Sequence, residues 1–279
     1  MLKYFLIYIF LCVTYITNAQ NTNYSIDKCN NYLKNSQYLD CIIECERILF
    51  YTDSLNIKKQ ALLIKGLAEK KQHKYTKASE TFSQLRITNP NDSLFTIKTY
   101  QTALCNYLAE NYEEAINTIT QWEIFNNQKD INEDIILIKI LSLNSLFRFK
   151  EAHIEVNKLN TNSNTVLKLN KLYHKRKTPR RKNPELSKNM SMIIPGLGQC
   201  YSSRWVEGGV SFILNAGALA FGGYHIYQGY YFTGYITGFT LLHKFHSGGM
   251  KRSATLAETR NKKNIIKYNQ KFIEIWENH

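Results

Sequence analysis

The stretch YTKASETFSQLRI, residues 75 to 87, carries a pattern that recurs along the first half of the chain. Its first residue, Tyr75, has counterparts at Tyr38, Tyr112 and Phe149, each 37 positions from the next. Three positions after each aromatic comes a small side chain, and four further on comes a larger apolar residue or cysteine: Cys41, Ala78, Ala115 and Ala152, then Cys45, Phe82, Ile119 and Val156. A fixed period of this length predicts similar units that bury their apolar faces on their neighbours.

Each unit has the pattern of two helices. In the quoted stretch, Ala78, Phe82 and Leu85 share one face at helical spacing, and Asn89-Pro90-Asn91-Asp92 then breaks the chain. The preceding segment, KKQALLIKGLAEK (residues 58–70), has small and apolar residues at similar spacing. We therefore expect an all-α fold of paired helices over residues 24–160.

This pattern resembles the tetratricopeptide repeat. Gly66 stands at that family's glycine, Ala78 at its small residue, Phe82 at its large apolar residue and Pro90 at its terminal proline. The second repeat matches the family pattern at all four points, whereas the third repeat lacks the proline and the first and fourth repeats match at fewer of these points. The resemblance implies a helical-repeat solenoid of four units.

Arrays of this family usually act as adaptors, and their first helices line a groove for a peptide or a partner helix. The resemblance places six residues on that groove: Gln60, Lys70, Tyr100, Tyr107, Asp134 and Asn144. The alternative for each of them is that it only caps or solvates the array.

Two cysteines stand at the first unit's equivalents of Gly66 and Ala78, where paired helices of this family approach most closely. They are Cys29 and Cys41, and a disulfide needs a Cα separation of about 4.4–6.8 Å, which such a crossing could supply. The alternative is that each is a small buried apolar residue. We keep the Cys29–Cys41 bridge as a prediction.

The N-terminus has the layout of a secretory signal peptide, residues 1–19. MLKYFLIYIFLCVTYITNAQ combines an early lysine, an apolar run and small residues before Gln20. The alternative is an uncleaved membrane anchor. Either interpretation places the following domain in the cell envelope, on the periplasmic side, and argues against nucleic acid as a partner.

The net charge of +14 is concentrated after residue 167. Residues 168–190 contain nine basic side chains and one acid, Glu185, so residues 161–188 are expected to form an exposed basic linker. Anionic lipid headgroups are the partner that this charge favours.

Formal charge then nearly vanishes. Between Trp205 and His243 the only charged residue is Glu207, and two apolar segments, residues 208–227 and 229–242, flank Gln228. The first is just long enough to cross a bilayer. Gly234 and Gly238 offer a smooth surface for close helix packing. We expect a membrane hairpin over residues 189–248; the alternative is a buried hairpin of a soluble domain.

The hairpin is preceded by PGLGQCY, residues 195–201. We expected Gly196 and Gly198 to make a tight turn at the membrane edge, with Gln199 satisfying backbone groups of the turn and Tyr201 in the interfacial belt. Pro195 would end the preceding run. The sequence resembles a bacterial membrane-hairpin domain of unknown function that carries P-G-x-G-Q-x-Y and a later G-x-x-x-x-A-x-x-A-x-x-x-N segment.

That later segment begins at Gly249 and ends at Asn261 in this chain. The chain departs from the pattern of that family at Ser202-Ser203, where similar sequences usually have a glycine or an asparagine. The family has no assigned activity that the resemblance could imply. Residues 249–279 are expected to form a basic amphipathic helix with Ile265, Tyr268 and Phe272 on one face. That face could lie on the bilayer or pack on the repeats.

No catalytic constellation is apparent in the sequence. His225, His243 and His246 could bind zinc, but no acidic side chain accompanies them as a base, and we predict neither a metal site nor a cofactor. We therefore predict a non-catalytic envelope adaptor that binds an unidentified envelope protein. The alternative is a membrane-embedded enzyme or a small-molecule or lipid site built on PGLGQCY.

Overall fold

The computed structural model describes residues 25–87, 92–126, 132–159 and 163–277. These residues form an all-helical protein without strands, as predicted. The chain divides into two compact units, residues 1–142 and 143–279, which are described separately. The predicted signal peptide and Pro90 lie outside the described residues.

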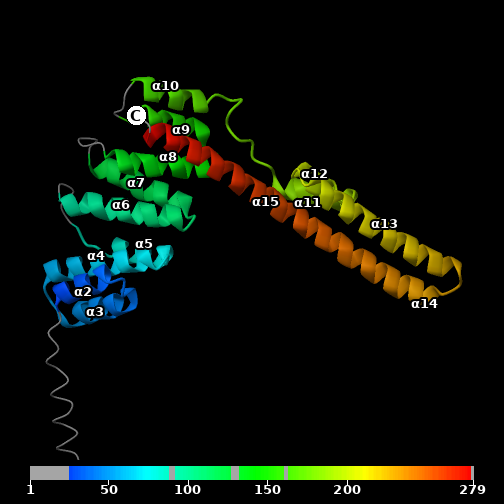
Figure 1. The fold of residues 1–279 in the computed structure, drawn as a ribbon, viewed down its shortest axis with the longest axis horizontal. Coiled ribbons are helices and arrows are strands. Elements are labelled where there is room, and N and C mark those ends of the chain that lie inside the picture. The colour runs from blue at the N-terminus through cyan, green and yellow to red at the C-terminus, as the bar shows by residue number, and fades with distance from the viewer. Residues whose placement is uncertain (1–24, 88–91, 127–131, 160–162, 278–279) are drawn as a thin grey trace, which may run out of the picture. The chain divides into compact units, whose positions relative to one another are not determined.

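The first compact unit consists of successive helices that pack on their sequence neighbours (Figure 1). They are α2 (Ile26–Lys34), α3 (Tyr38–Tyr51), α4 (Leu55–Lys71), α5 (Tyr75–Ser83), α6 (Ser93–Leu108), α7 (Tyr112–Phe125) and α8 (Glu133–Ser145), whose last turn belongs to the second unit. Side chains cap three of these helices: Ser25 accepts from the amide of Asp27, Asp92 from that of Leu94, and Asn132 from that of Ile135.

The period of 37 residues is visible in the backbone. Helices α3, α5, α7 and α9 (Phe149–Val156) begin at the four repeated aromatic residues. Two positions before each of these aromatic residues, a residue other than glycine has a positive φ: Ser36 (59°), His73 (58°), Glu110 (64°) and Phe147 (62°). Each of these left-handed residues terminates the first helix of a pair. The amide of the residue after it donates to a carbonyl five positions earlier in the chain, for example that of Gln37 to the carbonyl of Tyr32 at 2.9 Å.

The repeated apolar positions form the core. All eight residues at the small and the large positions of the period are fully buried. In the second helix pair, the ring of Phe82 lies against Gly66, so closely that a Cβ on Gly66 would be 2.6 Å from it. Glycine at this position therefore allows α4 and α5 to cross closely.

The second compact unit contains α9, α10 (Ser163–Leu172), α11 (Pro184–Ile193), α12 (Leu197–Tyr201), α13 (Trp205–Tyr227), α14 (Tyr231–Thr233), a π-helical turn η1 (Gly234–Gly238) and α15 (Phe239–Glu277). Much of the expected exposed linker, residues 161–188, is thus helical, as α10 and the first half of α11, and Leu169 and Ser187 within it are fully buried. Asn183 caps α11 by accepting from the amides of Glu185 and Leu186.

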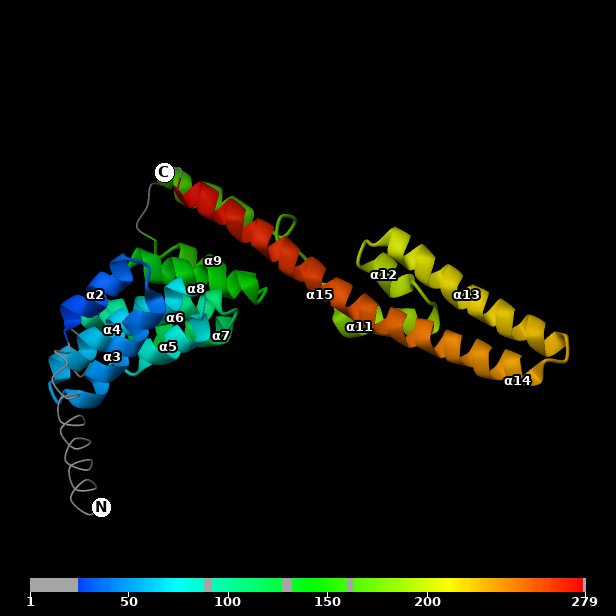
Figure 2. The same cartoon turned by 60° about the horizontal axis from the view of Figure 1, so that its bottom comes forward.

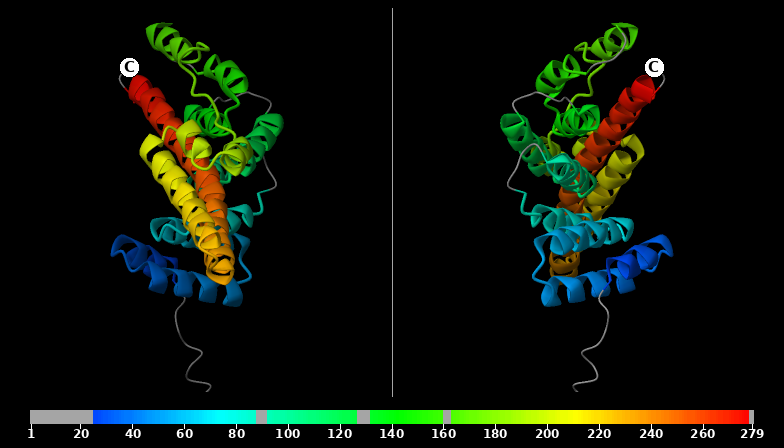
Figure 3. Two further views of the ribbon diagram at one scale, coloured as in Figure 1. Left: turned by 90° about the vertical axis from the view of Figure 1, so that its right-hand side faces the viewer. Right: turned by 90° about the vertical axis from the view of Figure 1, so that its left-hand side faces the viewer.

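Helix α13 and the run from α14 to α15 form a helical hairpin, which we define as residues 205–250. The two arms lie side by side in every view (Figure 2, Figure 3). Gly229, with φ of 85°, makes the turn between them.

The second arm continues without a break into the C-terminal helix, so residues 239–277 form one helix rather than a hairpin arm and a separate amphipathic helix. Its C-terminal part packs within the second unit, where Phe272 is fully buried and the ring of Tyr268 lies 5.2 Å from that of Phe149. The Tyr268 hydroxyl donates to the carbonyl of Leu172 at 3.2 Å. Of the two interpretations of this face, the structure shows packing on α9 and α10.

Candidate functional site

The PGLGQCY motif forms the sharp corner between α11 and α12. Gly196 has a left-handed backbone with φ of 95°, and a side chain there would overlap the carbonyl of Gly208 on α13. A Cβ on Gly198 would overlap the carbonyl of Ser187 on α11. A Cβ on Gly208 would in turn lie 2.5 Å from the sulfur of Cys200. The glycines are needed because three helices meet here at backbone distance.

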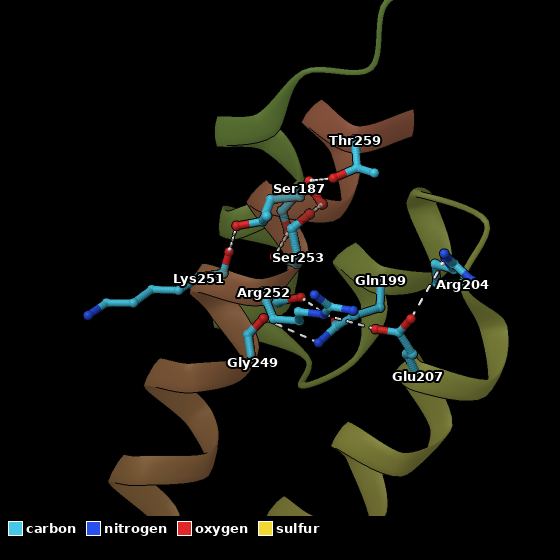
Figure 4. A network of polar contacts seen from close by, with 11 residues as sticks. Ser187, Gln199, Arg204, Glu207, Gly249, Lys251, Arg252, Ser253 and Thr259 are labelled. Atoms are coloured by element: carbon cyan, nitrogen blue, oxygen red, sulfur yellow. Dashed lines mark hydrogen bonds and ion pairs between the residues drawn. The ribbon is translucent and has the colours of Figure 1, made fainter. Parts of the chain in front are cut away.

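Gln199 is the polar centre of this corner and is almost fully buried. Its side-chain oxygen accepts from the Ser191 hydroxyl at 2.9 Å, and its side-chain nitrogen donates to the carbonyl of Gly249 on α15 at 3.2 Å (Figure 4). The Ser191 hydroxyl also accepts from the amide of Gly198 at 3.0 Å. Gln199 therefore ties the motif to a residue 50 positions away, a different role from the turn-satisfying one we expected.

A pair of serines joins α11 to α15 beside this centre. The Ser187 hydroxyl lies 2.9 Å from the carbonyls of both Gly198 and Ser253, and the Ser253 hydroxyl lies 3.1 Å from the carbonyl of Ser187. Both side chains are fully buried. Hydrogen bonds from hydroxyl to backbone thus connect the two helices.

The end of the later motif is joined to the residues before α11. The side chain of Asn261 pairs with the backbone of Lys182 through two hydrogen bonds, of 2.8 and 2.7 Å. The amide of Asn183 donates to the hydroxyl of Tyr201 at 3.3 Å, and the Lys182 ammonium lies 4.3 Å from the Tyr201 ring centre. The two sequence motifs are therefore parts of one packed structure.

An ion-pair group lies at the base of the hairpin. Glu207 on α13 pairs with Arg252 on α15 at 3.0 Å and approaches Arg204 at 3.7 Å (Figure 4). Trp205, at the start of α13, is 72% exposed, an arrangement compatible with the interfacial position expected for it.

Glycines also pack the two arms of the hairpin. A Cβ on Gly238 would be 2.6 Å from the Cα of Gly222, and one on Gly234 would be 2.8 Å from the Gly222 carbonyl oxygen. The close approach that we expected of Gly234 and Gly238 is therefore present, with Gly222 as its partner on α13. The small residues Gly209 and Gly217 instead face away, since nothing lies within 4 Å of a Cβ added to either.

The outer surface of the hairpin is apolar. Seventeen of the thirty-five exposed large hydrophobic side chains among the described residues lie between Trp205 and Phe239. Helix α13 is long and apolar enough to cross a membrane, and only 22% of its most apolar window is buried. An exposed apolar surface of this extent is a feature of membrane or partner contact.

The predicted groove residues have different environments. On the first unit, Lys70 on α4 donates to Gln101 on α6 at 2.6 Å, and burial lowers the pKa of Lys70. Burial and the nearby carboxylate of Asp134 raise the pKa of Tyr100, and α6 and α8 share a core through Ala103 and Ile135. Gln60 and Asp134 are exposed.

The remaining groove residues are more deeply packed. Tyr100 and Tyr107 are partly buried against the core around Ala103 and Ile119. Asn144, in the second unit, is fully buried and accepts from the Tyr173 hydroxyl at 3.1 Å. Asn144 therefore has a packing role that the alignment of repeats could not indicate.

Cys29, Cys41 and Cys45 form one buried group in the first helix pair, and the structure has all three as free thiols. The Cys41 thiol donates to the carbonyl of Cys29 at 3.4 Å. Burial raises the pKa of each thiol. The Cys29–Cys41 bridge stays a prediction.

Within the described part of the chain, no group of three or more histidine, cysteine or acidic side chains is placed to hold a metal ion. Comparisons with family models, with curated proteins and with solved structures found no match.

Proposed function

We propose that the protein is a non-catalytic adaptor of a bacterial envelope, in which the hairpin anchors the chain in a membrane and the helix pairs bind a protein partner. The observation that carries the proposal is the polarity of the hairpin region. Ser187, Gln199 and Ser253 are buried at the base of the hairpin, and the residues buried between its arms are small or polar, whereas its outer surface is covered by large apolar side chains. Helices in lipid pack closely through small residues and satisfy their polar groups with internal hydrogen bonds, while their outer surface is apolar.

The membrane part of the proposal can be tested on the full chain with paired arginine substitutions. Ile213 and Leu219 are 68% and 59% exposed on α13, so arginine there leaves the packing of the arms intact. In the middle of a bilayer each arginine would cost about 2.5–3.5 kcal/mol on insertion scales. We expect the wild-type protein to resist alkaline extraction from membranes and the Ile213→Arg/Leu219→Arg variant to be released.

The matched control is Phe50→Arg/Ile124→Arg, at positions 81% and 68% exposed in the first unit. This variant should stay with the membrane. Retention of the hairpin variant in the extracted membrane would contradict a membrane anchor.

Partner binding is supported by the first helices α4, α6 and α8, which lie next to one another on the first unit through Lys70, Gln101, Tyr100 and Asp134. Replacing Tyr100 or Tyr107 by alanine would disturb the core as well as the surface. Photo-crosslinking amino acids at exposed Gln60 and Asp134 are the cleaner probes, with exposed Glu80 on α5 as the control. A discrete adduct should form from the first two positions and not from Glu80; identical products from all three would contradict a groove on the first helices.

The proposed localisation places the helix pairs on the periplasmic side, with the basic segments near anionic headgroups. Each lysine or arginine close to such a surface contributes about 1 kcal/mol. Both flanks of a hairpin emerge on the same side of a membrane, so a reporter fused after His279 and active only in the cytoplasm should be silent. Reporter activity would contradict the export signal in residues 1–19.

A further inference from the structure

A cavity of about 460 Å³ lies between α13 and α15, directly beside the PGLGQCY motif. Val206, Val210 and Leu214 on α13 and Phe245 on α15 give it apolar walls, and Gln199 contributes to one end. All the lining residues belong to the second compact unit. Val206, Val210 and Leu214 are themselves 81%, 52% and 44% exposed, so the cavity is continuous with the apolar surface of the hairpin.

One buried polar atom in the wall of this cavity lacks a partner. Asn215 lines the cavity and is 2% exposed, and its side-chain oxygen makes no hydrogen bond. Its side-chain nitrogen donates to the carbonyl of Ser211 at 2.8 Å, which fixes the orientation of the amide, since the reverse orientation would set two oxygens against each other. A buried acceptor without a donor is unfavourable, and a ligand hydroxyl or amine that displaced the side chains covering this oxygen would satisfy it.

Positive charge is in excess around the same cavity. Lys244 and Arg252 line it from α15, and Glu207 is the one acidic residue among the lining side chains. Glu207 is already paired with Arg252 and approached by Arg204. A negatively charged group would thus be attracted to Lys244 and to the outer side of the Arg252 pair.

We infer that this cavity binds the headgroup of an acidic glycerophospholipid, with the phosphate near Lys244 and Arg252, a headgroup hydroxyl donating to Asn215, and an acyl chain along Val210 and Leu214. The inference rests on the proposed membrane location of the hairpin and adds a lipid specificity to it. A zwitterionic lipid lacks the net negative charge that the basic residues attract. A water-soluble phosphate has no apolar part that could contact the apolar walls of the cavity.

The test is lipid retention by the full chain, purified in a mild detergent and measured by native mass spectrometry. The probes are phosphatidylglycerol, phosphatidylcholine and soluble glycerol 3-phosphate. Wild-type protein should retain phosphatidylglycerol in preference to phosphatidylcholine by roughly tenfold, as expected for hydrogen bonds to a charged group. Lys244→Gln and Asn215→Leu should each reduce this preference severalfold or more.

Lys244 is exposed, so Lys244→Gln should keep the fold, and Lys263→Gln on the exposed side of the same helix is its matched control. The control should retain phosphatidylglycerol as the wild type does. Equal retention of the two lipids by the wild type, or a preference that survives both cavity variants, would overturn the inference. Binding of glycerol 3-phosphate as tight as that of the lipid would overturn the lipid assignment in favour of a soluble phosphate.

Membrane extraction separates this inference from the proposed function. If wild-type protein resists alkaline extraction but shows no lipid preference, only the headgroup site is wrong. If wild-type protein is released by extraction, the membrane anchor itself is wrong.

Discussion

The helix pairs of the first compact unit and the hairpin of the second differ in the side chains that they bury and expose at equivalent contacts between helices. At every repeated position of the first unit the buried side chain is apolar or a cysteine, as with Phe82 and Ile119. In the second unit the buried residues around the hairpin base include the polar Ser187, Gln199 and Ser253, and large apolar residues of the hairpin are exposed. Removal of apolar surface from water stabilises the first arrangement, whereas the exposed apolar surface of the hairpin gains nothing from water. The difference supports the proposed membrane location of the hairpin.

The largest expected effect comes from adding one methyl group to the hairpin base. In Gly198→Ala the new Cβ would overlap the backbone carbonyl of Ser187, which cannot move without separating α11 from α12. We expect a loss of more than roughly 4 kcal/mol and of the tertiary structure around the motif. Hydrogen exchange of the full chain in detergent would show lost protection in α11–α13 and unchanged protection in α3–α6.

The control for this change is Gly209→Ala on α13, where nothing lies within 4 Å of the added atom. It should leave protection unchanged. Native protection in Gly198→Ala would mean that backbone proximity is not what holds this region together.

The second prediction concerns the apolar core of the first unit. Phe82 is fully buried, and Phe82→Ala should cost about 3–5 kcal/mol because it leaves a cavity between α4 and α5. Urea unfolding followed by hydrogen exchange should localise the loss to the first unit. Phe50→Ala, at a position 81% exposed, should have almost no effect, and equal losses from both would contradict the assigned core.

The apolar half of this contrast could be predicted from the sequence, because the spacing of a helical face is local information. The period of 37 located the starts of α3, α5, α7 and α9 and the fully buried positions within them. Four left-handed residues at the same period were not predicted, since serine, histidine, glutamate and phenylalanine give no turn signal comparable to glycine.

The polar half could be predicted only in part. The sequence singled out Gln199, but its bond to Gly249 joins residues 50 positions apart, which no local pattern encodes. The cavity beside it depends on the register of α13 against α15, so Asn215 gave no sequence signal. Likewise the burial of Asn144 follows from its contact with Tyr173 on a segment that we expected to be an exposed linker.

The third prediction compares the thiols of the two units. Burial raises the pKa of Cys105 to about 11, from the ordinary value of 9.0. Since the thiolate is the reactive form, a shift of this size lowers its population at pH 8 by about a hundredfold, and the reaction rate should rise with pH until it approaches that pKa. We expect iodoacetamide to modify partly exposed Cys200 first in the native protein, and buried Cys45 and Cys105 only after unfolding.

The same experiment in denaturant tests the predicted bridge. Protein isolated under alkylating conditions should have Cys29 and Cys41 blocked until a reductant is added. Complete alkylation without reductant would show that both are buried free thiols.

The smallest effects are expected at two turns whose backbones are alike and whose residues differ. Ser36 ends α2 with φ of 59°, and Gly229 turns the hairpin with φ of 85°. A left-handed residue other than glycine costs about 1–2 kcal/mol, part of which is offset by the greater flexibility of glycine in the unfolded chain. We therefore expect Ser36→Gly to stabilise the first unit by about 0.5–1 kcal/mol, less a small loss from the exposed Tyr38–Ser36 hydrogen bond.

Gly229→Ala should destabilise the hairpin by about 1 kcal/mol through its backbone alone, because nothing lies within 4 Å of the added Cβ. Thermal unfolding in detergent, resolved by hydrogen exchange in each unit, measures both changes, and shifts of the same sign would show that these turns are not governed by backbone conformation.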